Sequence, residues 1–88
     1  MKKIYKVEFD YPVKIKGKEV KELVFRKPKV KDMRNMMDIG NNEVDREIWL
    51  ASALSGVTIS DIENLDFDQY QLIQKILGKF RRSPTANA

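Results

Sequence analysis

The sequence predicts an α+β fold in which an N-terminal β-hairpin is followed by three to four short helices that form one small domain. Apolar and mostly charged residues alternate from Tyr5 to Ile15, which is typical of a strand with one buried face. After Pro28 the apolar residues recur at helical spacing instead. Within residues 55–70, capping residues mark the end of one helix and then the starts of two further helices.

Eighty-eight residues provide for one domain with a single modest core. We expect this domain to span residues 1–82, with the hairpin at about 4–26 and the helical part at about 29–82. Residues 83–88 are small and polar and contain a proline, so we expect a disordered tail there. Because so small a domain buries only part of its apolar surface, we also expect it to bind a partner or to form a homo-oligomer.

The first strand should run from Tyr5 to Ile15, with its odd-numbered, apolar positions facing the core. Pro12 cannot donate a ladder hydrogen bond, so the strand is expected to lie at an edge or to carry a bulge there. A turn at Lys16-Gly17-Lys18 follows, because glycine readily takes a positive φ.

The second strand is expected from Val20 to Phe25. Leu23 and Phe25 share a parity that Val20 breaks, so the three cannot face the core from one regular strand. A β-bulge near Lys21-Glu22 would reconcile them.

Pro28 ends this strand and disfavours a helical residue before it, so the first helix should begin near Lys29 or Val30. Asp32 then lies in the first turn, where a negative charge interacts favourably with the helix dipole. One apolar stripe is expected to face the core, formed by Val30, Met33 and Met37.

Gly40-Asn41-Asn42 should break the first helix, and the second is expected from about Asn42 to Ser55. Gly56 then ends it by adopting the left-handed conformation. The buried residues of this helix are expected to be Val44, Ile48 and Ala51, with Trp49 and Leu54 as further candidates.

Two capping signals follow. Ser60 with Glu63 has the spacing of a capping box for a short helix that reaches Leu65. Asp66 with Gln69 is a looser version of the same device and should start the last helix. We therefore expect Gly56, Ser60, Glu63, Asp66 and Gln69 to have structural roles.

The last helix is expected from Asp66 to about Arg82. Leu72 and Ile76 widen its apolar face, so the helix should be buried on more than one side. The main apolar face is formed by Tyr70, Ile73, Leu77 and Phe80.

The residue types most used in catalysis are missing, since the sequence has no histidine and no cysteine. We predict no catalytic residue, no metal site and no cofactor, and an enzyme is the least expected class. The acidic cluster Asp61, Glu63, Asp66 and Asp68 offers oxygen ligands that suit Mg²⁺ or Ca²⁺. Its spacing is not that of a calcium hand, and capping accounts for three of its members.

The longest apolar runs fall far short of the roughly twenty residues that span a bilayer. Glu8 and Asp10 interrupt the stretch after the basic start, so no signal peptide is predicted. A cytoplasmic protein that does not contact membranes is expected.

Charge is unevenly distributed along the chain. Residues 1–31 hold eleven Lys/Arg and four Asp/Glu, a net charge of +7, whereas residues 32–78 hold three and nine, a net of −6. The lysine-rich hairpin could contact phosphates as a small nucleic-acid-binding regulator would. Four acidic residues interleave with those lysines, however, so a solvated strand face is favoured and nucleic-acid binding is not expected.

Met33, Met36 and Met37 offer an adaptable apolar surface, although their helical spacing is also typical of a core. Met36 fits the stripe least well and is the candidate for an exposed contact. Trp49 lies beside Ile48, and the pattern leaves open whether it anchors the core or an interface.

The order of these segments resembles the tail assembly chaperone proteins of Mu-like and P2-like tailed bacteriophages and prophages. The likeness covers roughly residues 5 to 80 and rests on three segments: an Arg-x-Pro step into a helix, a Leu-x-Gly helix stop and a Leu-Asp-x-x-Asp-like helix entry. They are found at residues 25–33, 50–57 and 62–70. Lys29 departs from the pattern, because a small capping residue such as Thr is expected after the proline.

The resemblance implies a non-enzymatic role in phage tail assembly, in the cytoplasm of the bacterial host and outside the mature virion. It implies binding to the tape measure protein, with tail tube subunits as further partners. Members of this family are often also made in a longer form by ribosomal frameshifting, and such a fusion would continue after Phe80. A structural subunit of the tail is a further alternative. The residues expected to contact the tape measure protein are Met33, Met36, Met37, Trp49, Tyr70, Ile73, Leu77 and Phe80.

Overall fold

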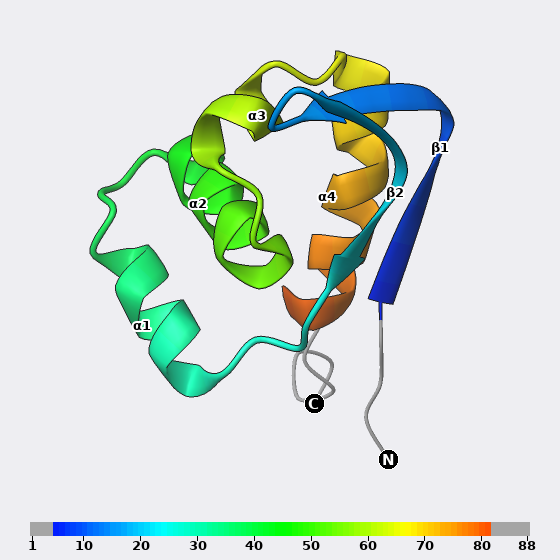
Figure 1. Ribbon diagram of the computed structural model, residues 1–88. Coiled ribbons are helices and arrows are strands. Elements are labelled where there is room, and N and C mark those ends of the chain that lie inside the picture. The colour runs from blue at the N-terminus through cyan, green and yellow to red at the C-terminus, as the bar shows by residue number, and fades with distance from the viewer. Residues whose placement is uncertain (1–4, 82–88) are drawn as a thin grey trace.

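The computed structural model describes residues 5–81, in which an antiparallel two-stranded hairpin packs against a group of helices (Figure 1). The predicted α+β fold is confirmed. The predicted tail at residues 83–88 lies outside the described residues. The elements in chain order are β1 (Tyr5–Ile15), β2 (Lys18–Phe25), α1 (Val30–Met37), α2 (Glu43–Ser55), α3 (Ile59–Glu63) and α4 (Phe67–Arg81).

Lys16 and Gly17 form the two-residue turn of the hairpin, since Ile15 pairs with Lys18. Their φ angles are 54° and 78°, and two positive values in a row match the twist of the flanking strands. Glycine adopts this conformation freely. Lys16 is held in it by a hydrogen bond from its backbone N–H to Asp61 Oδ2, at 3.0 Å. The predicted turn is confirmed.

The strand pairing is irregular in the middle of the hairpin. Glu8 pairs with Glu22, but the next pair joins Val13 to Val20. Residues 9–12 of β1 therefore lie opposite a single residue of β2. The bulge predicted at Pro12 in the first strand is confirmed. The bulge predicted near Lys21-Glu22 in the second strand was wrong, because the extra residues belong to β1.

Tyr11 departs from the predicted buried face of β1. Its neighbours of the same parity, Phe9 and Val13, are buried, whereas Tyr11 is 40% exposed. The extra residues in this part of β1 change the direction of the side chain, and the Tyr11 hydroxyl donates to Asp66 Oδ2 over 2.8 Å. A polar partner outside the core thus accounts for the exception.

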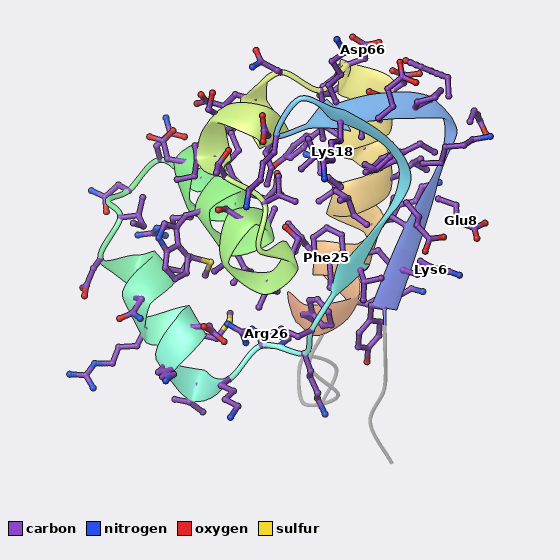
Figure 2. The ribbon with its side chains drawn as sticks, viewed as in Figure 1. Lys6, Glu8, Lys18, Phe25, Arg26 and Asp66 are labelled. Carbon is purple, nitrogen blue, oxygen red and sulfur yellow. The ribbon has the colours of Figure 1, made fainter. Side chains whose placement is uncertain are left out.

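The core lies between one face of the hairpin and helices α2 and α4. Its largest fully buried side chains are Phe25, Leu50, Ile73 and Leu77. Phe25 points from β2 toward the helices (Figure 2). Because alternate strand residues and spaced helical residues meet there, two different periodicities build one core.

A salt bridge fastens α1 to the end of β2. The Arg26 guanidinium donates to both carboxylate oxygens of Asp32, at 2.7 and 3.0 Å, and the Lys29 backbone N–H donates to the same carboxylate at 2.8 Å. The Arg26 backbone N–H also donates to the Leu54 carbonyl at 3.0 Å. We call this arrangement the Arg26–Asp32 clamp. It supplies the start of α1 with the hydrogen-bond acceptor that Lys29 cannot provide.

The clamp determines which face of α1 is buried. Asp32 is buried, and Met36, one turn later, packs against the core. The predicted stripe faces outward instead, with Val30 84% exposed and Met37 57% exposed. The prediction that Val30 and Met37 face the core and that Met36 is the exposed methionine was wrong, because the partner of Asp32 lies outside the helix.

Helix α2 begins and ends close to the predicted residues. The Asn42 side chain accepts hydrogen bonds from the Val44 and Asp45 backbone N–H groups, at 2.9 and 3.1 Å. Gly56 ends the helix with φ 78°, as predicted. Val44 was expected in the core but is 57% exposed, since the first turn of α2 extends past the edge of the core. Ala51 and Leu54 are buried as predicted, together with Leu50, which was not predicted.

The cap of α3 is Thr58 and not Ser60. The Thr58 side chain accepts a hydrogen bond from the Asp61 backbone N–H at 3.2 Å, whereas Ser60 lies inside the helix. The prediction of a Ser60–Glu63 capping box was therefore wrong. At the start of α4, Gln69 Oε1 accepts a hydrogen bond from the Asp66 backbone N–H at 3.1 Å. This is one of the two hydrogen bonds of the capping box that was predicted for Asp66 and Gln69.

Candidate partner-binding surface

A cleft between α1, α2 and α4 brings three of the predicted contact residues together. Its volume is about 130 Å³. Leu50 and Leu77 are fully buried at its base, Met36 is half-buried and Met37 is exposed at its edge. We call this site the methionine cleft; its lining is Met36, Met37, Glu43, Arg46, Glu47, Leu50 and Leu77.

One wall of the methionine cleft is polar and comes from α2. Glu47 Oε1 accepts hydrogen bonds from the Tyr70 hydroxyl at 2.7 Å and from Gln74 Nε2 at 3.0 Å. Burial and this contact with a carboxylate raise the pKa of Tyr70 above its ordinary value, so its hydroxyl remains a donor. Tyr70, which was predicted to contact a partner, is half-buried and holds the Glu47 side chain through this hydrogen bond.

The other predicted residues of α4 pack in or against the core. Ile73 is 0% exposed and does not line the methionine cleft, whereas Leu77, 1% exposed, reaches only the base of that cleft. Phe80 is half-buried and packs edge-on against Tyr5, with ring centroids 4.6 Å apart. An apolar face at helical spacing does not by itself distinguish a core from a docking surface.

A second hollow, of about 200 Å³, lies on the other side of α2 and contains the single tryptophan. Ile39 and Ile59 are 40% and 41% exposed, and Ile48 and Trp49 are half-buried beside them. We call this site the tryptophan groove; its lining is Ile39, Asp45, Ile48, Trp49, Ile59 and Glu63. Trp49 therefore both packs against the core and lines an open groove.

Ile39 and Ile59 were not predicted as contact residues. Each lies at a helix boundary, Ile39 just beyond α1 and Ile59 at the first position of α3. Neither belongs to a periodic stripe that would have indicated a face. The only local signal was a large apolar residue beside a turn or a cap.

The acidic residues near α3 and α4 hold the tip and the bulge of the hairpin. The Tyr11 hydroxyl donates to Asp66 at 2.8 Å and to Asp68 at 3.0 Å, while Gln69 Nε2 donates to the Tyr11 carbonyl at 3.3 Å. We call these four residues the Tyr11 latch. Hydrogen bonds to the two carboxylates raise the pKa of Tyr11 above its ordinary value.

Asp66 and Asp61 thus bind the hairpin, through Tyr11 and the Lys16 backbone, rather than capping their own helices. Across the described part of the chain, no three carboxylates lie close enough together to hold a metal ion. Three of the four acids, Asp61, Asp66 and Asp68, therefore accept hydrogen bonds from the hairpin, which differ from the capping bonds that were predicted.

The outer face of the hairpin mixes both charges. The Lys6 Nζ atom lies 3.5 Å from Glu8 Oε2 and 3.7 Å from Glu22 Oε1. Lys6 and Glu8 project from the side of β1 that faces away from the helices (Figure 2). A phosphate backbone favours an uninterrupted basic stripe. The charges of this face therefore do not favour the nucleic-acid alternative.

Within residues 5–81, none of the helices has the length and apolar character that crossing a bilayer requires.

Comparison with known proteins adds a family assignment. Comparison with curated proteins and comparison with solved structures each give no match. Residues 6–82 match the family described as phage tail assembly chaperone proteins, E, or 41 or 14. Since this match spans most of the sequence, the chain belongs to the phage tail assembly chaperone family.

Proposed function

We propose that this protein binds the phage tape measure protein during tail assembly and catalyses no reaction. It acts in the cytoplasm of the bacterial host, brings tail tube subunits to the complex and is absent from the mature virion. The family assignment supports the assembly role. The methionine cleft is the observation that carries the proposed contact, because it combines an apolar base with an open, adaptable edge.

The chemistry of the cleft suits one face of an apolar helix. Methionine is unbranched and flexible, so Met36 and Met37 can adjust to side chains of different shape along a long partner. Burial of apolar area contributes about 25 cal/mol per Å² to such a contact. The lining carries two carboxylates, Glu43 and Glu47, and one cation, Arg46; this charge pattern sets the orientation of a partner more than its affinity.

The proposal is tested by co-expression of this protein with a phage tape measure protein. The wild-type chain should keep the tape measure protein soluble and co-elute with it in size-exclusion chromatography. Met37→Glu places a charge at the edge of the cleft and should abolish the complex. Met33→Glu is the matched control, since Met33 lies on the same helix but does not line the cleft.

Three results would contradict the proposal. If the tape measure protein is equally soluble alone and no complex elutes, the chaperone role fails. If Met37→Glu and Met33→Glu bind equally well, the methionine cleft is not the contact site. If the protein is found in purified virions, it is a structural subunit of the tail rather than an assembly factor.

A further inference from the structure

The tryptophan groove is built from two helices that each place an acid beside apolar residues. On α2, Asp45 precedes Ile48 and Trp49 by about one turn, so the three share one face of that helix. On α3, Ile59 and Glu63 are the first and last residues and share a face in the same way. Because α2 and α3 pack together (Figure 1), the groove has an apolar base and two carboxylates at its rim.

The apolar part of the groove is open to solvent. Ile39 and Ile59 line it and are 40% and 41% exposed. Val44, also exposed, lies one turn before Ile48 and extends the apolar surface along α2. An exposed apolar patch that is rimmed by polar residues is typical of an interaction site.

The charge of the rim is not neutralised within the domain. Among residues 5–81, no ion pair includes Asp45 or Glu63. Arg46 is the single cation in the sequence of α2, and its Nε atom donates to the Gly40 carbonyl while its side chain lines the methionine cleft. A ligand that covers the tryptophan groove is therefore favoured if it brings positive charge to the rim, and disfavoured if it brings negative charge.

We propose that the tryptophan groove binds a basic apolar segment of a partner protein. Large apolar side chains of that segment cover Trp49 and Ile59, and the lysine or arginine residues beside them approach Asp45 and Glu63. The groove and the methionine cleft share no lining residue and lie on different sides of α2, so one chain can hold two partner segments at once. This inference goes beyond the proposed tape measure contact and does not rest on it.

The groove holds only a few side chains, since its volume is about 200 Å³. The contact is therefore smaller than that of a standard stable complex, and we expect a dissociation constant on the order of micromolar to millimolar. Added salt should weaken the binding, because exposed charges contribute to it.

The test uses the purified chain and two synthetic helical peptides that contain no tryptophan. One peptide has leucines at helical spacing with lysines beside them, and the other has glutamine in place of each lysine. Trp49 is the only tryptophan of the chain, so its emission should shift to shorter wavelength as a peptide covers the groove. The lysine peptide should bind more tightly than the glutamine peptide.

A neutralised rim tests the charge recognition. Asp45→Asn combined with Glu63→Gln should weaken binding of the lysine peptide about 2- to 30-fold, as two exposed ion pairs predict, and leave the affinity for the glutamine peptide unchanged. The matched control is Asp10→Asn combined with Glu19→Gln, which changes the net charge equally at exposed positions of the hairpin. The control should bind both peptides as the wild type does.

A second pair of variants tests the apolar base. Ile59→Ser should weaken binding of both peptides about 3- to 20-fold, because less apolar area is covered. Val24→Ser, at an exposed apolar position on the hairpin, is the control and should change neither affinity.

Each other outcome overturns the inference. If the emission of Trp49 does not change at millimolar peptide, the groove takes no such segment. If the two peptides bind equally well, or the control for net charge weakens binding as much as the neutralised rim, the rim does not recognise charge. If Ile59→Ser binds as Val24→Ser does, the peptide lies elsewhere.

A shift of the Trp49 emission with protein concentration alone would show that a second copy of the chain covers the groove instead, and would also overturn the inference. None of these measurements involves the tape measure protein. The proposed function therefore stands or fails separately.

Discussion

Neutralising Asp32 should destabilise the protein in a way that depends on pH. Hydrogen bonds from Arg26, and then from the Lys29 backbone, lower the pKa of Asp32 from 3.8 to about 2. At about 1.4 kcal/mol per pH unit, this shift corresponds to at most about 2.5 kcal/mol. Arg26 is half-exposed, and solvent screens its charge, so we expect Asp32→Asn to lower the free energy of unfolding by about 1–2 kcal/mol at pH 7.

The sign of the pH dependence follows from the direction of the shift. A carboxyl group whose pKa is lowered in the folded state stabilises that state above pH 3.8 and loses its effect as the pH falls toward 2. At pH 3 about half of the difference between the wild type and Asp32→Asn should remain. Above pH 5 the difference should be constant.

Urea denaturation followed by circular dichroism, at a series of pH values from 7 to 3, measures this difference. Asp38→Asn is the control, because Asp38 lies at the other end of α1 and is exposed. It should change the stability little at any pH. If Asp32→Asn costs less than about 0.5 kcal/mol, or if its effect is the same at pH 3 and pH 7, the clamp does not hold α1 through charge.

Further substitutions test the turns and caps. Gly56→Ala should lower the free energy of unfolding by about 1 kcal/mol, because φ is 78° there. Gly78→Ala, in open space within α4, should raise it by up to about 1 kcal/mol. Urea denaturation should therefore give changes of opposite sign for the two variants, and changes of the same sign would contradict the left-handed end of α2. Thr58→Ala should cost about 0.5–2 kcal/mol and Ser60→Ala much less, and the reverse order of unfolding midpoints would refute the observed cap. Tyr11→Phe should speed amide hydrogen exchange in β1, and unchanged exchange would mean that the Tyr11 latch does not hold the bulge.

The hairpin and the end of α2 could be predicted because each depends on residues close together in the sequence. Alternation in β1, the turn at Lys16-Gly17 and the left-handed Gly56 each depend on residues a few positions apart. The prediction of the α3 cap was wrong because Thr58 and Ser60 both precede an acidic residue by three positions. Spacing alone could not distinguish between the two residues.

Long-range partners explain the other errors. The buried face of α1 depends on Asp32 reaching Arg26, and the exposure of Tyr11 depends on Asp66, which is 55 residues away. In the candidate site, Met36, Met37 and Leu77 meet only because α1 and α4 both pack on α2. A helical stripe in the sequence shows that residues share a face, but not which neighbour covers it.

The Arg26–Asp32 clamp also bears on the entropy of binding. A helix of eight residues is too short to persist in water by itself. Because the Arg26 backbone is bonded to Leu54 and the Arg26 guanidinium holds Asp32, the clamp keeps α1 helical before any partner arrives. Ordering this segment is then part of folding and is not subtracted from the affinity of later contacts, so even a small helix can serve as a preorganised recognition element.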